Sequence, residues 1–594
     1  MKKKCLFGLS LIALLSLAGC TSTSKNETED IGGDYSYNDP ITVDDPEDID
    51  IEENTGEFSI TTSDGAYTNS GNIYHLTKGG TYALSGKLSG QILVEAGEDD
   101  VVVLELKNFS IEYDQDSPIK ILSADKVEIS AKSDTGNTIT DNRNAKTTDV
   151  LDQGEGAIYA KSDLKFKGAG ILVVTGNYNN GVHTTKNLTI QKLTLKVVGN
   201  NNALKGNDGI TITSGTVQAY ALTGNGIKTE NTDVSSKGNQ RGTVAINGGY
   251  VYVDSLHDAI DASYNVEINQ LDSEVSTAIS IKTGTNSTYY SKTTFKADSE
   301  KGVKAQNDII VNGGTMVIAA SDDAVHANYG ITLDNGNKGT GNITITGGAV
   351  QVASGDDGLH ADNTLTISGG RVVVTGATEG FEGNYINISG GSSYIYGTDD
   401  GVNCSKKSFN TCSFTMSGGY LDVAVKSGDT DGIDSNGDVT ISGGVIVSRG
   451  SPGTTQSNMS TGLDVDGTCS MTGGTLIAFN GLEKTPSKSS SILYAGTSNA
   501  NSSSGGGPGG GGGGPGGGGG GGHWSYNAST TYTFQNGKYR LVGTNIDISF
   551  TNDYTYGSFQ IHSASLSTGA TYELYRNDEQ VLSWSQSSSS VTIS

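Results

Sequence analysis

The feature that most constrains this 594-residue chain is a short motif that recurs around a pair of glycines. In "ASGDDGLHADNTLTISGGRVVV" (353–374), two aspartates precede an aliphatic residue, and Ser-Gly-Gly then precedes a run of valines. Glycine pairs of this kind occur at Gly248-Gly249, Gly313-Gly314, Gly347-Gly348, Gly369-Gly370, Gly390-Gly391, Gly418-Gly419, Gly443-Gly444 and Gly473-Gly474. The shortest steps are 22 residues (347 to 369) and 21 residues (369 to 390). A period of roughly 20–50 residues indicates a repeat architecture.

Each repeat contains three short apolar segments separated by turns. In the motif above these are "GLHA" (358–361), "LTIS" (365–368) and "RVVV" (371–374). Three strands and three corners make one coil of a parallel β-helix, whose successive coils stack about 4.8 Å apart. One inward aliphatic side chain per strand fills a narrow core, which explains a hydrophobic content of only 34%. Glycine pairs suit corners that need positive φ or exclude a side chain. The sequence therefore predicts an all-β chain, a parallel β-helix with coils of about 22 residues.

The two ends of the chain differ from the repeats. Lys2 to Lys4, an apolar stretch (6–17) and Leu-Ala-Gly-Cys (17–20) resemble a bacterial lipoprotein signal, which implies cleavage before Cys20 and lipidation of its thiol; ordinary secretory cleavage is the alternative. Residues 20–55 are acidic without periodicity and predict a disordered spacer. The β-helix is assigned to 56–504, a flexible glycine-rich linker to 505–522 and a small C-terminal β domain, or alternatively a terminal cap, to 523–594. These segments place the protein on the extracellular face of a bacterial membrane, anchored by lipid, as a monomer.

Net charge limits the classes of partner, and the cysteines raise the question of a disulfide. The chain has 38 basic and 65 acidic residues, a formal charge of −27, so a nucleic acid partner is excluded by repulsion of its phosphates. The acidic surplus suits either cation binding or simple solubility. Cys404 and Cys412 flank a short insertion and form either a disulfide or two buried thiols, whereas Cys469 is expected in the core.

The acidic corners fall in register along the predicted coils. The residue after the inward aliphatic of each repeat lies in one outward column: Lys205, Lys228, Asp261, Lys304, His326, His360, Glu382, Asn403, Asp434 and Asp464. Further acids stand just before it in most repeats. Carboxylates one strand spacing apart repel each other, and Ca²⁺, which prefers oxygen ligands, would remove that repulsion. The alternative is that aspartate simply favours turns and stays solvated.

Several stretches carry a resemblance to a known family. "LTKGGTYALSGKLSGQILVEA", "SDDAVHAN", "SGDDGLHADNTLTISGG", "TEGFEGNYINISGG" and "GTDDGVN" closely resemble the bacterial carbohydrate-binding β-helix family related to the pectate lyase superfold, over residues 77–481. The resemblance implies a right-handed parallel β-helix, Ca²⁺ at several coils and non-catalytic binding of plant cell-wall polysaccharide. The metal ligands it implies are Asp258, Asp261, Asp322, Asp323, Asp356, Asp357, Asp399, Asp400, Asp431 and Asp434. Asn202, Asn225 and Lys301 replace acids in earlier coils, which weakens the expectation of metals there.

The expected ligand is cellulose or an acidic pectin such as polygalacturonate. Ca²⁺ can bridge a protein carboxylate and a uronate, and column lysines Lys205, Lys228 and Lys304 can add ion pairs or remain solvated. His326 and His360 of the same column are predicted as further substrate contacts. Neutral glucans stack on exposed aromatic rings, for which the candidates are Tyr220, Tyr250, Tyr252, Tyr394, Tyr396 and Tyr420; ordinary strand tyrosines are the alternative.

Two other functions compete with simple binding. A pectate lyase would need a basic catalytic residue beside the acids, but none of the six arginines falls in the column, and polygalacturonase signatures are absent. Catalysis also needs one special coil, whereas this chain repeats one corner, which favours a binder that is not an enzyme. The other alternative is a surface scaffold whose helix binds only metal while the C-terminal domain binds the ligand.

Overall fold

The computed structural model describes residues 36–49, 51–148, 153–292, 297–453, 460–494, 497–498, 526–527 and 533–593. The predicted signal peptide, Cys20 and the glycine-rich linker lie outside these residues. The described residues form strands and two short 3₁₀ helices, η1 (Gly284–Asn286) and η2 (Tyr290–Lys292), and contain no α-helix, so the all-β prediction is confirmed. Within the described part, no helix has the length and apolar character needed to cross a membrane.

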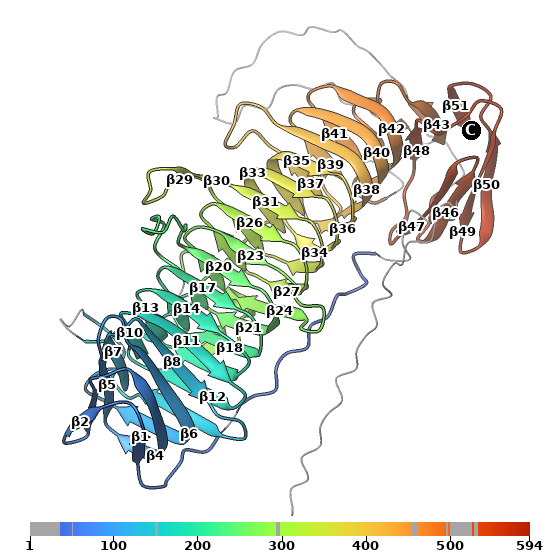
Figure 1. The fold of residues 1–594 in the computed structure, drawn as a ribbon. Helices are drawn as coiled ribbons and strands as arrows, with labels where there is room; N and C mark the ends of the chain where they lie inside the picture. The colour runs from blue at the N-terminus through green and yellow to red at the C-terminus, as the bar shows by residue number, and fades with distance from the viewer. Residues whose placement is uncertain are drawn as a thin grey trace, which may run out of the picture.

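Most strands belong to one large sheet of three columns, here named A, B and C (Figure 1). Within a column each strand pairs in parallel with the corresponding strand of the next repeat. Column A contains β3 (Ile73–Leu76), β5 (Gln91–Glu95), β7 (Ile119–Ser123), β10 (Gly156–Ala160), β13 (Asn180–Thr184), β16 (Leu204–Gly206), β19 (Ile227–Lys228), β22 (Ile260–Ala262), β25 (Val303–Ala305), β28 (Val325–Ala327), the first parts of β33 (Leu359–Ile367) and β35 (Phe381–Ile388), β37 (Val402–Cys404), β39 (Ile433–Ser435) and β41 (Leu463–Val465).

Columns B and C complete each repeat. Column B contains β8 (Lys126–Ala131), β11 (Asp163–Gly168), β14 (Asn187–Ile190), β17 (Gly209–Ile212), β20 (Thr243–Ile246), β23 (Val266–Ile268), β26 (Asp308–Val311), β31 (Asn342–Ile345), the second parts of β33 and β35, and the first parts of β38 (Ser413–Val425), β40 (Asp438–Arg449) and β42 (Cys469–Phe479). Column C contains β9 (Gly136–Asp141), β12 (Ile171–Gly176), β15 (Thr194–Gly199), β18 (Thr216–Ala221), β21 (Gly249–Ser255), β24 (Thr277–Thr283), β27 (Thr315–Ala319), β32 (Ala349–Ala353), β34 (Arg371–Ala377), β36 (Ser392–Gly397) and the second parts of β38, β40 and β42. Near the N-terminus, β4 (Gly80–Ser89) and β6 (Val101–Tyr113) span columns B and C.

The core is one continuous row of aliphatic side chains inside the three columns. Column A contributes one large buried side chain to most strands, for example Ile260, Val303, Val325, Leu359, Phe381, Val402, Ile433 and Leu463, and often a second, mostly small, buried residue two positions on, such as Ala305. Because each strand is short and alternates inward and outward residues, the next residue points away from the core. The core therefore fixes which side chains form the outward column.

The glycine pairs turn the chain from column B into column C. The second glycine has positive φ at Gly249, Gly314, Gly348, Gly370, Gly391, Gly419, Gly444 and Gly474. A Cβ on Gly391 would lie 2.6 Å from the carbonyl oxygen of Gly370 in the preceding repeat. Both the backbone conformation and the close stacking therefore require glycine, as predicted.

Replacing Gly391 by alanine is expected to destabilise the protein by about 2 kcal/mol, because alanine at positive φ is strained and its methyl group overlaps the preceding corner. Gly376→Ala is the matched control, since Gly376 has no heavy atom within 4 Å of the Cβ position. Thermal melting of both variants checks the prediction. Equal melting temperatures would show that the corner relaxes without cost.

Antiparallel strands cover both ends of the stack. At the N-terminal end, β1 (Ser59–Thr62) pairs with β4, and β2 (Tyr67–Ser70) pairs with β3. At the other end, β48 (Phe559–Ser563) pairs with both β42 and β43 (Ser490–Tyr494), and β51 (Ser590–Ile593) pairs with β43. A four-stranded antiparallel sheet of β47 (Ile546–Asn552), β46 (Gly537–Gly543), β49 (Thr571–Arg576) and β50 (Glu579–Ser585) stands beside this end (Figure 1). The smaller pairs are β29 (Tyr329–Thr332) with β30 (Lys338–Thr340) and β44 (Thr497–Ser498) with β45 (Tyr526–Asn527).

The C-terminal residues therefore act as a cap: their strands pair with the last strands of the stack, and their apolar side chains pack against outward residues of column C. Phe479 of β42 packs against Phe534, Phe550 and Phe559 of the C-terminal region. The fully buried Arg449 of β40 donates hydrogen bonds to Asn552 and to the carbonyl oxygen of Thr551. Sequence periodicity could not reveal this docking, because it depends on contacts between distant segments.

Candidate functional site: the acidic column

The structure places the predicted outward column in register on column A. Lys228 pairs with Lys205 on one side and Asp261 on the other, and the register continues through Lys304, His326, His360, Glu382, Asn403, Asp434 and Asp464. Acids of the turn between columns C and A stand beside it. The column has three parts with different electrostatics: a lysine-paired part, a histidine-containing part and an all-acid part.

In the first part, lysines of the column neutralise the acids. Lys228 pairs with Asp261 at 2.6 Å, Lys304 with Asp258 at 3.1 Å and Lys205 with Glu230 at 2.7 Å. Asp258 also accepts hydrogen bonds from the Ser299 hydroxyl and the Lys301 amide. Asp258 and Asp261, two predicted metal ligands, thus already have lysine counter-charges in this structure. The same pairs engage the three lysines that were predicted to contact substrate.

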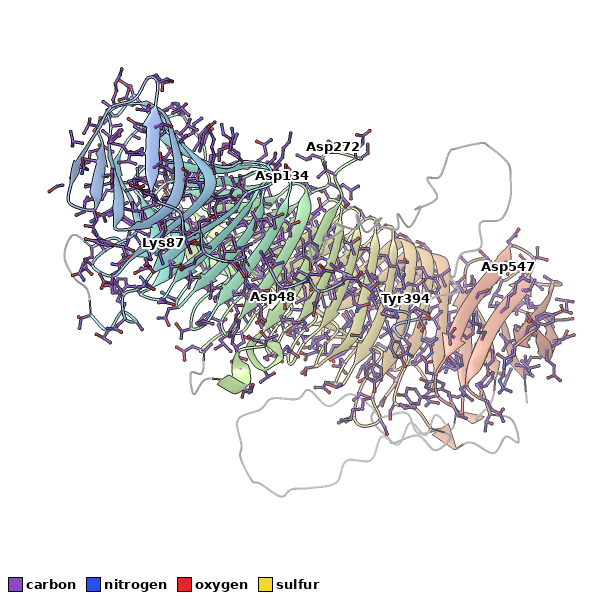
Figure 2. All side chains as sticks on the ribbon, turned by 90° about the horizontal axis from the view of Figure 1, so that it is seen from below. Asp48, Lys87, Asp134, Asp272, Tyr394 and Asp547 are labelled. Atoms are coloured by element: carbon purple, nitrogen blue, oxygen red, sulfur yellow. The ribbon has the colours of Figure 1, made fainter. Side chains whose placement is uncertain are left out.

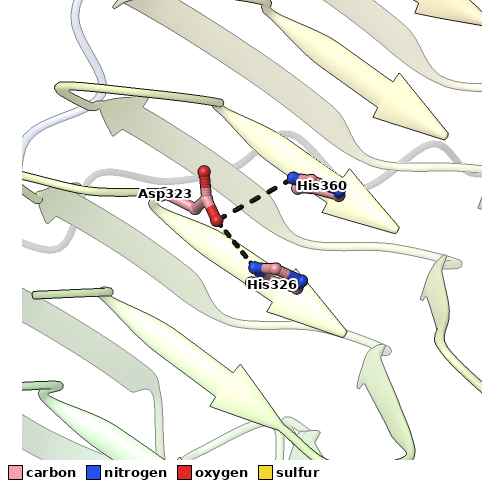
Figure 3. Close-up of side chains that lie close together, drawn as sticks. All are labelled: Asp323, His326 and His360. Atoms are coloured by element: carbon pink, nitrogen blue, oxygen red, sulfur yellow. Dashed lines mark hydrogen bonds and ion pairs between the residues drawn. The ribbon is translucent and has the colours of Figure 1, made fainter. Parts of the chain in front are cut away.

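The second part brings two histidines against buried acids (Figure 3). The rings of His326 and His360 stack with centroids 4.3 Å apart and an interplanar angle of 7°. Nδ1 of His326 lies 2.6 Å from Oδ2 of Asp323, and Nδ1 of His360 lies 3.8 Å from the same oxygen. Asp362 approaches the Nε2 atoms of both rings, at 3.5 and 3.4 Å. Both histidine side chains are only 12% exposed, so they lie inside a polar network rather than on an open surface.

The charges within this network are tightly linked. Burial acts to lower the pKa of His360, but hydrogen bonds with Asp357 and Asp362 raise it to about 10, which keeps the ring cationic at neutral pH. Burial and the neighbouring Glu379 and Glu382 raise the pKa of Asp357 to about 9. Glu382 is fully buried beside His360 and pairs with Lys407. A proton and a lysine thus offset part of the negative charge.

Asp322 and Asp323 share a lysine from the preceding repeat. Nζ of Lys301 lies 2.9 Å from Asp322 and 2.6 Å from Asp323. Burial opposes ionisation of Asp323, but the hydrogen bond with His326 and the charge of Lys301 hold its pKa below the usual range. From the sequence, Lys301 is only a lysine in place of a corner acid. Its role as the counter-charge for Asp322 and Asp323 of the next repeat was missed.

The third part is a run of acids in which burial and mutual repulsion dominate. Burial together with Asp434 and Asp399 raises the pKa of Asp400 to about 7. Burial and neighbouring carboxyl groups likewise raise the pKa values of Asp431 to about 8, Asp434 to about 6 and Asp464 to about 7. Backbone amides oppose this in part, since Asp431 donates its amide to Asp400 at 2.8 Å and Thr461 donates its amide to Asp431. These carboxyls hold protons near neutral pH and would release them to a bound cation.

Four groups of donor atoms converge closely enough to hold a metal ion. They are Asp323–His326–His360, Asp357–His360–Glu382, Asp322–Asp323–Asp356 and Asp356–Asp357–Glu379, with ligand atoms within 4.8 Å of one another. The last group contains only carboxylate oxygens, a donor set that fits Ca²⁺, and its Asp357 also lies 2.9 Å from Nδ1 of His360. Burial and the nearby Asp323 and Asp322 raise the pKa of Asp356, and the charge of Lys301 opposes them only in part. Glu379 was not among the predicted ligands, although it occupies the same corner of its repeat.

The cysteines and several of the tyrosines singled out from the sequence are buried. Cys404, Cys412 and Cys469 are free and buried, so the thiol alternative holds for the first two. Tyr394 and Tyr420 are buried in column C, whereas Tyr220, Tyr250 and Tyr396 remain partly exposed on that column. An open polar hollow of about 530 Å³ borders Lys205 and is lined by Lys146, Glu155, Asn180 and Asn201.

Comparisons with known proteins agree with a carbohydrate-related role. The chain matches the family described as carbohydrate-binding domain-containing protein over residues 70–358 and 338–506, and it belongs to that family. A protein of that description from Acetivibrio thermocellus is 33% identical over 288 residues, which cover 46% of this chain and 91% of the relative. A solved structure, the gadolinium derivative of a polysaccharide lyase-like protein from C. thermocellum, is 31% identical and covers 43% of this chain and 91% of its own, with a TM-score of 0.35.

Proposed function

We propose that this protein is a non-catalytic, cell-surface carbohydrate-binding protein, with a right-handed parallel β-helix that binds plant cell-wall polysaccharide. Polygalacturonate is the preferred ligand and cellulose a second one. A lipid on Cys20 would anchor the chain to the extracellular face of the bacterial membrane. The observation that carries the proposal is the acidic column, because one corner is repeated in register over many repeats. A repeated surface suits a repeating polymer.

Calcium is proposed for the later part of the column. Asp356, Asp357 and Glu379 would hold one ion, and the acids around Asp400 and Asp431 would hold others. A bound Ca²⁺ has room in its shell for a uronate carboxylate, which explains how an acidic protein can bind an acidic polymer. Lysine-paired repeats such as that of Asp258 are left out of this proposal.

Binding without catalysis is favoured by the placement of the arginines. Each of the six makes a contact away from the acidic column: Arg143 with Asp141, Arg241 with Asp233, Arg371 with Asp39, Arg449 with Asp422, Arg540 with Asp547 and Arg576 with Asn536. A lyase needs a base beside the metal-bound uronate. The described part of the column contains acids, and its lysines and histidines are already held in ion pairs with acids.

Affinity gels containing polygalacturonate or cellulose test the proposal. The full chain is expected to be retarded by polygalacturonate in Ca²⁺ and released by EDTA, without new ultraviolet absorbance from unsaturated products. Asp357→Asn is expected to weaken retardation about tenfold, the effect of losing one ligand of a bridging ion. Asp272→Asn, at an exposed site away from the column, is the control. Growth of absorbance would instead identify a lyase, and retention unaffected by EDTA would remove Ca²⁺ from the mechanism.

A further inference from the structure

The segment just before the first strand lies along column C instead of extending away as a disordered spacer. It is the blue segment that follows the stack in Figure 1, here named the strap (residues 36–49 and 51–55). The sequence predicts a disordered spacer here, and in the structure Asp45 and Asp48 of this segment pair with lysines of the stack. The strap crosses many repeats: Asp39 contacts β34, and Asn54 contacts β6.

The contacts of the strap are made by outward side chains of column C. Lys196 pairs with Asp48 and Lys282 with Asp45, both at 2.5 Å. Four neutral or backbone contacts add to them: Gln218 Nε2 to the Glu47 carbonyl at 3.1 Å, the Tyr250 hydroxyl to the Asp44 carbonyl at 2.7 Å, Arg371 to the Asp39 carbonyl at 2.9 Å, and the Ile41 amide to Gln351 at 2.6 Å. Tyr37 stacks on Tyr396 at 5.1 Å. Figure 2 labels Asp48 over the earlier repeats and Tyr394 nearer the C-terminal sheet.

The strap makes no β ladder in the described part of the chain, where the first strand begins at Ser59. It is held only by side-chain contacts. Asp48 and Asp45 are 78% and 55% exposed, whereas their lysine partners are 16% and 27% exposed. Exposed ion pairs of this kind are weak individually and are screened by salt. The part of the strap around Asp45 and Asp48 is therefore held less firmly than the paired strands of the stack, whereas Tyr37 at its start is buried.

The surface under the strap combines positive charge with aromatic rings. Nζ of Lys196 lies 5.6 Å from the centre of the Tyr220 ring, Nζ of Lys282 lies 5.8 Å from that of Tyr252, and the guanidinium of Arg371 lies 5.7 Å from that of Tyr394. Residues 36–49 include five acids and no lysine or arginine. An acidic polysaccharide would match the same face, with carboxylates for the lysines and sugar rings for the partly exposed Tyr220, Tyr250 and Tyr396. Tyr252 and Tyr394 are themselves buried and support this face from beneath.

We propose that the basic and aromatic face of column C is a second binding surface for polyuronate, and that the strap is an internal acidic occupant which the polymer must displace. This inference rests on the proposed polyuronate binding but uses a different face from the Ca²⁺ corner. The strap thus sets a threshold: only a ligand with many regularly spaced carboxylates competes with a segment that is tethered to the same chain.

The test weakens the strap and measures the affinity of the full chain for polygalacturonate by calorimetry in Ca²⁺. Asp45→Asn/Asp48→Asn is expected to bind about three- to tenfold more tightly than wild type, because the strap is released more easily. Asp134→Asn/Asp272→Asn makes the same change in net charge at exposed sites labelled away from Asp48 in Figure 2 and is expected to gain much less. Adding Lys196→Gln/Lys282→Gln to the strap variant is expected to abolish the gain.

Hydrogen exchange supplies a readout that does not depend on affinity. Amides of residues 39–48, including that of Ile41, are expected to exchange faster when polygalacturonate is bound. Equal affinities of the two Asp→Asn variants, with strap exchange unchanged by the polymer, would overturn the inference while leaving Ca²⁺-dependent binding intact. Absence of any binding by wild type and both variants would overturn the proposed function as well, so the two failures are distinguishable.

Discussion

Replacing Arg449 by methionine is expected to lower the free energy of unfolding of the C-terminal end of the stack by about 3–5 kcal/mol. Arg449 is 1% exposed and pairs with the buried Asp422, whose pKa is raised by burial despite this arginine. It also donates to the Val423 carbonyl of the neighbouring repeat and to two groups of β47. Methionine leaves Asp422 without its counter-charge and removes the polar contacts of Arg449 that join the stack to β47. Denaturation followed by fluorescence is the measurement, since Trp584 is buried in the C-terminal sheet.

Arg540→Met is the matched control for this variant. Arg540 forms an ion pair with Asp547 at 2.5 Å, but its side chain is 57% exposed. The expected cost is below about 1 kcal/mol. Combining Arg449→Met with Asp422→Leu is expected to recover part of the loss, because no buried charge then remains unpaired. An Arg449→Met protein as stable as the control would show that water or a shifted side chain compensates Asp422.

In EDTA, the protein is expected to lose stability as the pH rises from about 5 to 8. The pKa values of Asp400, Asp431, Asp434 and Asp464 are raised to about 7, 8, 6 and 7, against about 3.9 in the unfolded chain. Between these limits the folded state binds more protons than the unfolded state, so the free energy of unfolding falls with increasing pH. We expect a loss of about 3 kcal/mol, smaller than the separate shifts would add to, because partial exposure screens the repulsion.

Calcium is expected to offset this loss of stability at high pH. An ion among the carboxylates replaces the protons, so its stabilising effect is larger at pH 8 than at pH 5. The charged neighbours that take part are Glu379, Asp399, Asp466 and Glu483. Melting temperatures at both pH values, in EDTA and in Ca²⁺, provide the check. Flat profiles in EDTA, or Mg²⁺ acting as well as Ca²⁺, would contradict an oxygen-rich calcium site.

Local sequence signals were sufficient to predict the repeat and the register of the outward column. The inward Leu359 fixes His360 as outward, and the next repeat fixes Glu382 beside it, so strand periodicity alone predicts their register. Periodicity could not show that Lys304 pairs with Asp258, because that contact depends on side-chain reach between repeats. It also could not place residues 36–55, whose composition is that of a disordered segment, nor the docking of β48 on β42.

The strap has a consequence for cooperativity along the stack. In a solenoid each repeat contacts only its neighbours, so unfolding can begin at either end and stop at any repeat. The strap touches β34 through Asp39 and β6 through Asn54, and it thereby connects repeats whose strands do not pair with each other in the described sheet. The strap works as a longitudinal tie: while it is seated, fraying of the first repeats also costs contacts far along the stack. A polymer that replaced the strap would take over this mechanical role, and the bound glycan itself would then hold the repeats together.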